Sequence, residues 1–105
     1  MQVIDDMPSA ETLAAITDTT LVSRGRSVLA SELHGEVVMM HIARGSYFGL
    51  DDIGSDIWRR IAPPMTFAAL VEGLSAAYNA SPAVVAEDVR LLLARMSAQD
   101  AVVLG

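Results

Sequence analysis

The stretch of residues 36–61 decides the fold: Glu-Val-Val-Met-Met-His-Ile-Ala-Arg-Gly-Ser-Tyr-Phe-Gly-Leu-Asp-Asp-Ile-Gly-Ser-Asp-Ile-Trp-Arg-Arg-Ile. Its apolar first part predicts a central strand, and Arg44 and Gly45 predict a hairpin turn. A very short edge strand is expected at residues 47–50, followed directly by a helix that Asp51 or Asp52 caps. Such an edge leaves backbone N–H and C=O groups unpaired, and they can accept a strand from another chain. This open edge is the predicted working surface.

Composition limits the classes of protein to consider. A chain of 105 residues with 52% hydrophobic and 19% charged residues predicts one globular domain that buries roughly 60 to 65% of its unfolded surface. The net charge is −6 and the seven basic residues are scattered arginines, which argues against a nucleic-acid partner. No cysteine is present, so disulfides and thiolate sites are excluded. We expect a cytoplasmic protein without membrane contact, because no 18-residue apolar run and no signal-peptide pattern occurs.

The residues before the central strand are less decisive. We expect residues 1–18 to be a tail or a short element lying across the sheet, and residues 19–105 to be the domain. Residues 9–16 could form two helical turns, and a sharper alternative is that this segment covers a sheet face. A strand is expected at residues 27–33, with a two-residue turn at His34-Gly35. The next strand is apolar on both sides, which predicts that helices cover one sheet face and the N-terminal segment or a second subunit covers the other.

The rest of the chain is predicted to be helical. After the helix that ends before Pro63, a second helix should begin at Thr66 and stop near Asn79. A third should begin at Ser81 and Pro82, and residues 101–104 should form a terminal strand or an extended arm. The predicted fold class is therefore α+β and winged-helix-like, with a three-stranded antiparallel sheet followed by three helices.

Catalytic, metal and DNA-binding functions are not supported by the residues. His34 and His41 lack metal-ligand spacing, no nucleophile elbow occurs, and neither a catalytic site nor a cofactor is expected. The paired acids Asp51 and Asp52 are interpreted as helix caps, and Trp58 as a core residue. A winged-helix DNA-binding regulator is the alternative function, but the second and third helices carry no basic cluster for phosphate contact.

Three segments together resemble a known family. They are residues 33–58, residues 64–74 (Pro-Met-Thr-Phe-Ala-Ala-Leu-Val-Glu-Gly-Leu) and residues 85–96 (Val-Ala-Glu-Asp-Val-Arg-Leu-Leu-Leu-Ala-Arg-Met). This pattern resembles the PqqD-like peptide chaperones, also called RiPP recognition elements, which bind the leader segments of ribosomally made precursor peptides. The resemblance covers residues 21–104, and its most specific part is residues 45–58. One departure is Gln99-Asp100, where the family usually turns with a glycine before its last apolar stretch.

The resemblance implies a mode of binding and a set of contact residues. Family members hold the leader as an added antiparallel strand in a groove between the third strand and the third helix. Carried onto this chain, the peptide-binding residues are Ser46, Tyr47, Phe48, Gly49 and Leu50 on the strand, with Val84, Asp88, Leu91 and Arg95 on the helix; the choice of helix face is inferred from spacing.

The leading hypothesis is a non-catalytic subunit that presents a precursor peptide to other enzymes. A stand-alone domain of this size best resembles the recognition subunit of lasso-peptide systems, which implies a leader peptidase and a cyclase as partners. The quinone-cofactor pathway, with a radical tailoring enzyme, is the close alternative. A third hypothesis is a dimerisation module that uses the apolar sheet face, so a homodimer is also among the expected partners.

Overall fold

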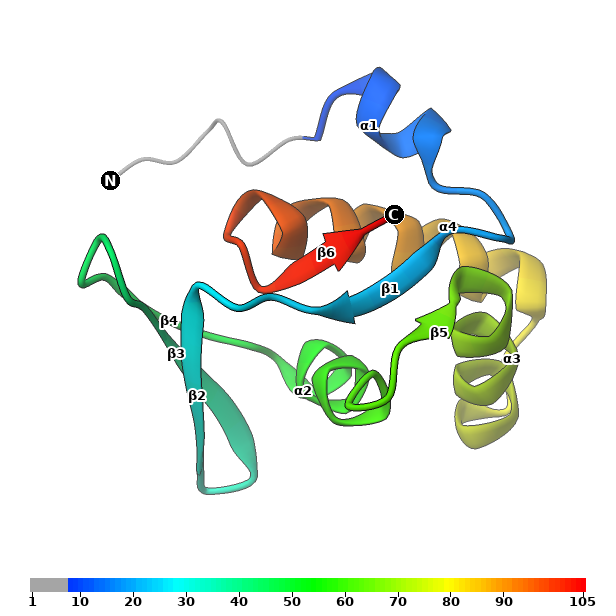
Figure 1. Ribbon diagram of the computed structural model, residues 1–105. Helices are drawn as coiled ribbons and strands as arrows, with labels where there is room; N and C mark the ends of the chain where they lie inside the picture. Colours follow the sequence, from blue (N-terminus) through cyan, green and yellow to red (C-terminus); the bar gives the residue numbers. More distant parts are fainter. Residues whose placement is uncertain (1–7) are drawn as a thin grey trace.

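The computed structural model describes residues 8–105, which form four helices and two three-stranded antiparallel sheets (Figure 1). In chain order the elements are α1 (Ala10–Ala15), β1 (Leu21–Arg24), β2 (Val28–Leu33), β3 (Glu36–His41), β4 (Tyr47–Gly49), α2 (Asp52–Arg60), β5 (Met65–Thr66), α3 (Phe67–Tyr78), α4 (Pro82–Ala98) and β6 (Val102–Leu104).

The first sheet consists of the three predicted strands, in the order β2-β3-β4. The turn between β2 and β3 falls at His34 and Gly35, which have φ angles of 55° and 85°. Two successive positive φ values favour glycine and match the twist of a tight hairpin. Met39 in β3 pairs with Ala30 in β2 and with Phe48 in β4, so β3 is the central strand and β4 is an edge.

The second sheet, with order β5-β1-β6, was largely missed by the sequence analysis. Only the strand near the C-terminus was expected; β1 and the two-residue β5 were not. These short strands depend on partners far along the chain, since Val22 pairs with both Met65 and Leu104. The α+β class is confirmed, and the sheet β2-β3-β4 is followed by α2, α3 and α4 as predicted. The prediction was incomplete, because the described residues also contain a second sheet and a fourth helix.

The helices begin and end largely where local chemistry places their caps. The Asp51 carboxylate accepts a hydrogen bond from the N–H of Gly54, and the Thr66 hydroxyl accepts one from the N–H of Ala69. Ser81 precedes α4 as predicted, but its side chain makes no capping bond; Pro82 is the first helical residue. The Asp51 and Thr66 side chains each satisfy an N–H group that the first helical turn leaves without a partner.

The core lies where α2, α3 and α4 meet both sheets. Its fully buried side chains come from every layer: Val22, Met39, Ile57, Ile61, Phe67, Leu70, Leu74 and Leu93. Trp58 belongs to this core, as predicted, with 9% of its surface exposed. The predicted first helix of the domain, α2, therefore packs on the core through Ile57 and Trp58. No helix within residues 8–105 is long and apolar enough to cross a membrane.

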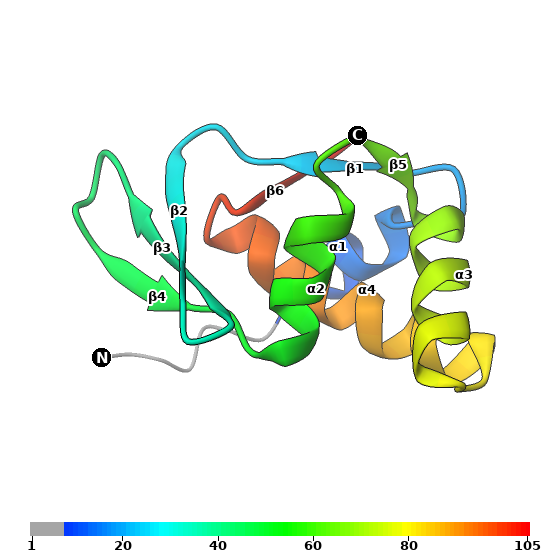
Figure 2. The same cartoon turned by 90° about the horizontal axis from the view of Figure 1, so that it is seen from below.

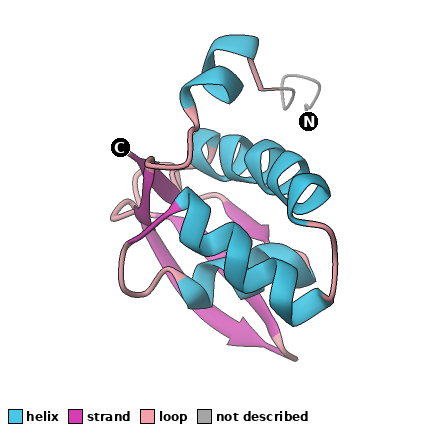
Figure 3. Ribbon diagram, turned by 90° about the vertical axis from the view of Figure 1, so that its right-hand side faces the viewer, coloured by secondary structure: helices cyan, strands magenta, loops and turns pink. Residues whose placement is uncertain are grey.

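The N-terminal helix α1 has the predicted position but not the predicted contact. The Ser9 side chain caps it by accepting a hydrogen bond from Thr12 N–H. The helix packs beside α4 (Figure 3), and Arg90 of α4 donates to the carbonyl of Ile16 at its end. The described part of this segment therefore does not lie across or cover the β2-β3-β4 sheet; residues 1–7 lie outside the described residues.

Only one face of the β2-β3-β4 sheet is covered by the described residues. Met39 on the inner face is fully buried, whereas Leu29 and Tyr47 on the outer face are 57% and 73% exposed. Both pair with Met40, so their side chains share that outer face. The expectation that both faces are covered is therefore wrong for the described residues of a single chain.

Candidate functional site

The edge strand β4 offers an unpaired main chain. Leu50 N–H donates to Val37 C=O at 2.9 Å, and His41 N–H donates to Ser46 C=O at 2.8 Å. Main-chain groups alternate in direction along a strand. The groups of Ser46, Phe48 and Leu50 therefore face β3, and those of Tyr47 and Gly49 face away from the sheet. Among residues 8–105, no hydrogen bond to the main chain of Tyr47 or Gly49 occupies this edge.

A groove runs between this edge and α4. Figure 2 shows the chain passing from β4 directly into α2, with α4 close by. Two adjoining hollows of about 280 and 270 Å³ share Asp51, Leu92 and Arg95 in their walls. The first also contacts Phe48, Gly49, Leu50, Met96 and Gln99, and the second also contacts Ile53, Asp88, Val89 and Leu91. We call this combined cleft the β4–α4 groove.

Most of the residues predicted for peptide binding lie at this groove. Phe48, Gly49 and Leu50 line its strand side. Asp88, Leu91 and Arg95 line its helix side. Ser46 and Tyr47 lie on the exposed edge beyond it, and Val84 lies one helical turn before Asp88, exposed and outside both hollows.

Sequence reasoning missed six of the residues that line the groove: Asp51, Ile53, Val89, Leu92, Met96 and Gln99. Asp51 was interpreted as a helix cap and Gln99 as part of the turn after the third helix, and the other four lie on apolar helical stripes. A helical stripe marks the buried face, but it does not show which of its members border an opening; Leu92 is only partly buried. For two of these residues the sequence does contain a signal, because Asp51 and Ile53 come shortly after the edge strand.

The groove has an apolar floor with charges at its rim. Phe48, Leu91 and Leu92 are partly buried, so each keeps some apolar surface in contact with solvent. Arg95 is exposed, and its side chain forms no ion pair or hydrogen bond with any described residue. Asp88 is likewise exposed. This arrangement can hold apolar side chains in the floor and pair with charges at the margin.

The groove offers no constellation for catalysis. His41 is buried behind the edge, where its ring bonds Asp100 and the N–H of Arg44. Within residues 8–105, no cluster of three His, Asp or Glu side chains could hold a metal ion. The chemistry that the residues support is binding of an extended chain through an edge and apolar contacts.

Comparison with known proteins identifies the family. A family model described as "Coenzyme PQQ synthesis protein D (PqqD)" matches residues 36–102, which is more than half of the chain. The chain belongs to the PqqD family. Membership of this family confirms the prediction that the protein is not an enzyme. The match begins with β3 and runs into β6, so it includes both walls of the β4–α4 groove.

A solved structure supports the same relationship. The structure described as "TbiB1 in Complex with the TbiA(beta) Leader Peptide" is similar to this PqqD-family chain, with a TM-score of 0.70 and 28% sequence identity. The similarity covers 76% of this chain and 93% of that one. Among curated proteins no relative matches significantly.

Proposed function

We propose that this chain binds the leader segment of a ribosomally made precursor peptide by adding it as a strand to β4. The observation that carries the proposal is the main chain of Tyr47 and Gly49, which no residue of 8–105 occupies, with the β4–α4 groove beside it. A structural relative whose complex is described with a leader peptide supports the same use of the fold. In this proposal the arrangement is winged-helix-like, with the β2-β3-β4 sheet as the wing.

The edge supplies only part of the affinity. Tyr47 and Gly49 together offer two N–H and two C=O groups, which at about 1 kcal/mol net for each hydrogen bond give about 4 kcal/mol. A micromolar complex requires about 8 kcal/mol, beyond the cost of ordering a flexible peptide. Apolar anchors must therefore contribute the rest. Each leader side chain buried in the floor between Phe48 and Leu91 adds about 1.5 to 3 kcal/mol.

The charged rim sets the register of the bound strand. Asp88 and Arg95 lie about two helical turns apart on α4, so they can pair with leader charges of opposite sign at separate points. Exposed pairs contribute about 0.2 to 1 kcal/mol each, so they select between registers more than they add affinity. In the same proposal Val84 extends the helix wall for a longer leader, and Ser46 and Leu50 flank the two pairing residues.

The proposed partners follow from this role. A leader held at the edge leaves the remainder of the precursor free for a separate peptidase and cyclase, as in lasso-peptide systems, or for a radical tailoring enzyme. These reactions take place where precursor peptides are synthesised, so the proposal includes a cytoplasmic location. No observation in the structure favours the DNA-binding alternative.

Titration with the leader peptide encoded beside the gene for this chain tests the proposal. We expect saturable binding by calorimetry in the micromolar range. Leu91→Asp should weaken it at least tenfold, because a carboxylate would enter the apolar floor. Val103→Asp is the matched control, since Val103 is 52% exposed on β6 and does not line the groove. The absence of saturable binding, or an equal loss in both variants, would overturn the proposal.

A further inference from the structure

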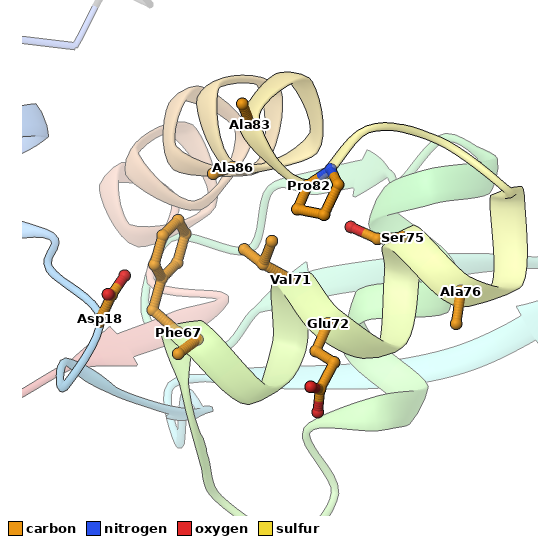
Figure 4. A pocket seen from close by; sticks show the side chains of 10 residues that line it. Asp18, Phe67, Val71, Glu72, Ser75, Ala76, Pro82, Ala83 and Ala86 are labelled. Atoms are coloured by element: carbon orange, nitrogen blue, oxygen red, sulfur yellow. The ribbon is translucent and has the colours of Figure 1, made fainter.

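A second groove lies between α3 and α4, and no step of the proposed leader binding uses it. Its volume is about 600 Å³, larger than that of either hollow of the β4–α4 groove. Figure 4 shows Phe67 and Val71 at its floor, with Pro82 and Ala86 of α4 opposite. We call this hollow the α3–α4 groove.

One polar group in the α3–α4 groove lacks a partner. The hydroxyl of Ser75 points into the space between the two helices (Figure 4), and only 8% of the Ser75 surface is exposed. Its Oγ makes no hydrogen bond with any described residue. A buried hydroxyl without a partner is unfavourable, so native proteins usually supply one. An incoming ligand with a hydrogen-bonding group would satisfy it.

The walls indicate the shape of that ligand. Ala68 and Ala76 on α3, and Ala83 and Ala86 on α4, line the groove with small side chains. Ala68 and Ala76 are separated by about 12 Å along the helix axis, which is a little more than two turns. Small residues over such a length allow a third helix to approach closely and place its apolar face in the groove.

The charges indicate the composition of that helix. Asp18 and Glu72 both lie on the α3 side of the groove in Figure 4, where the C=O of Asp18 accepts a hydrogen bond from the N–H of Ala68, and none of the lining residues is basic. Two carboxylates along one side of an apolar groove favour cationic side chains that reach outward from an apolar contact. We propose that the α3–α4 groove binds an amphipathic helix of a separate protein, with aliphatic residues on one face and lysine or arginine beside them.

This second site is separate from the β4–α4 groove. Pro82 and Leu91 are nine residues apart on α4, about two and a half turns, so they lie on opposite faces of the helix. A helix seated against Pro82 and Ala86 would therefore leave the β4 edge free. The inference does not rest on leader binding, although a carrier that presents a leader to an enzyme would need two such surfaces.

Two model peptides test the inference on the full chain. The first is a 14-residue helix of leucine, alanine and lysine with blocked ends; the second has glutamate in place of each lysine. We expect saturable binding of the lysine peptide, with amide NMR shifts concentrated at residues 68–76 and 83–86, and at least tenfold weaker binding of the glutamate peptide. Equal affinity for both peptides, or shifts concentrated at β4, would overturn the inference.

Matched variants separate the groove from general attraction to an acidic protein. Ala76→Phe should fill the groove and weaken binding of the lysine peptide at least tenfold. Ala77→Phe is the control, because Ala77 is also exposed on α3 but does not line the groove. The double variant Asp18→Lys and Glu72→Lys should reverse the preference toward the glutamate peptide. Equal effects of the two phenylalanine variants, or an unchanged charge preference, would contradict the proposal.

Discussion

The Nε2 atom of His41 lies 2.7 Å from Oδ2 of Asp100, joining the end of β3 to the turn between α4 and β6. The N–H of Arg44 donates to Nδ1 of the same ring, so Nε2 carries the proton that Asp100 accepts. Asp100 has a φ of 61°, the left-handed conformation that a glycine would adopt without strain. The sequence departure at Gln99-Asp100 therefore keeps the turn and adds a bond that anchors the β3–β4 hairpin.

Substitution of Asp100 should separate the contribution of its bond to His41 from the cost of its positive φ. Asp100→Ala loses the bond to His41 and places alanine at a positive φ, so we expect a loss of about 2 to 3 kcal/mol in the free energy of unfolding. Asp100→Gly loses the bond but relieves the backbone, and its loss should be smaller by about 1 kcal/mol. Urea unfolding measures both. Wild-type stability in the alanine variant would show that the bond contributes nothing.

Gly25 should tolerate no side chain, because another segment of the main chain approaches it closely. A Cβ atom there would lie 1.9 Å from the carbonyl oxygen of Asp100. Gly25→Ala must displace backbone, and we expect destabilisation by at least about 2 kcal/mol or failure to fold. Gly49→Ala is the control, since no atom of residues 8–105 lies within 4 Å of its Cβ position, its chain neighbours apart. Similar thermal unfolding of the two variants would contradict this expectation.

The ion pair between Glu32 and Arg59 ties the β2–β3 hairpin to α2. The Arg59 guanidinium bonds both carboxylate oxygens, at 3.1 and 2.9 Å, and the carbonyl of Gly35. The hydrogen bond from Arg59 is the main cause that lowers the pKa of Glu32. A lowered pKa in the folded state means that this contribution to stability is present at neutral pH and is lost as the pH falls through that value.

Replacement of Arg59 tests whether its hydrogen bond lowers the pKa of Glu32. In Arg59→Gln the pKa of Glu32 should rise toward its ordinary value, as measured by NMR titration of the side-chain carboxyl carbon. In the wild-type protein, stability falls as acid protonates Glu32. This fall should be smaller in Arg59→Gln. An unchanged titration of Glu32 would show that the contact does not persist in solution.

Tyr47 offers a test of binding through the main chain. Its N–H faces away from the sheet and its side chain is 73% exposed, so proline there removes no hydrogen bond of the folded domain. Tyr47→Pro should weaken leader binding at least fivefold more than Tyr47→Ala, which keeps the N–H group. Calorimetry measures the affinities, and circular dichroism checks the fold. Equal affinities would indicate that the Tyr47 N–H does not pair with the leader.

The sequence predicted the parts of the fold that local chemistry determines. The His34-Gly35 turn, the Asp51 and Thr66 caps and the end of α3 at Asn79 each depend on neighbouring residues, and all are present. The strands β1 and β5 depend on partners more than 40 residues away and carry almost no local signal. The prediction that the N-terminal segment lies across the sheet failed for the same reason. The contact of α1 with α4 is tertiary and has no local sequence signal.

The sequence predicts the strand side of the candidate site, but only part of its helix side. The edge strand follows from the short aromatic segment before Asp51, and its two outward residues follow from strand alternation. Helical spacing put Asp88, Leu91 and Arg95 on one face, and all three line the groove, but it did not single out Leu92. A residue at the border of a buried stripe can face either the core or a cleft, and only the neighbouring elements decide which.

Hydrogen exchange of the β4 amides tests the central claim most directly. Without a ligand, the N–H groups of Tyr47 and Gly49 should exchange rapidly, whereas those of Phe48 and Leu50 should be protected by their bonds to β3. Saturation with the leader peptide should slow exchange at Tyr47 and Gly49, giving protection at four consecutive residues. Rapid exchange at both positions with the leader fully bound would contradict the addition of a strand.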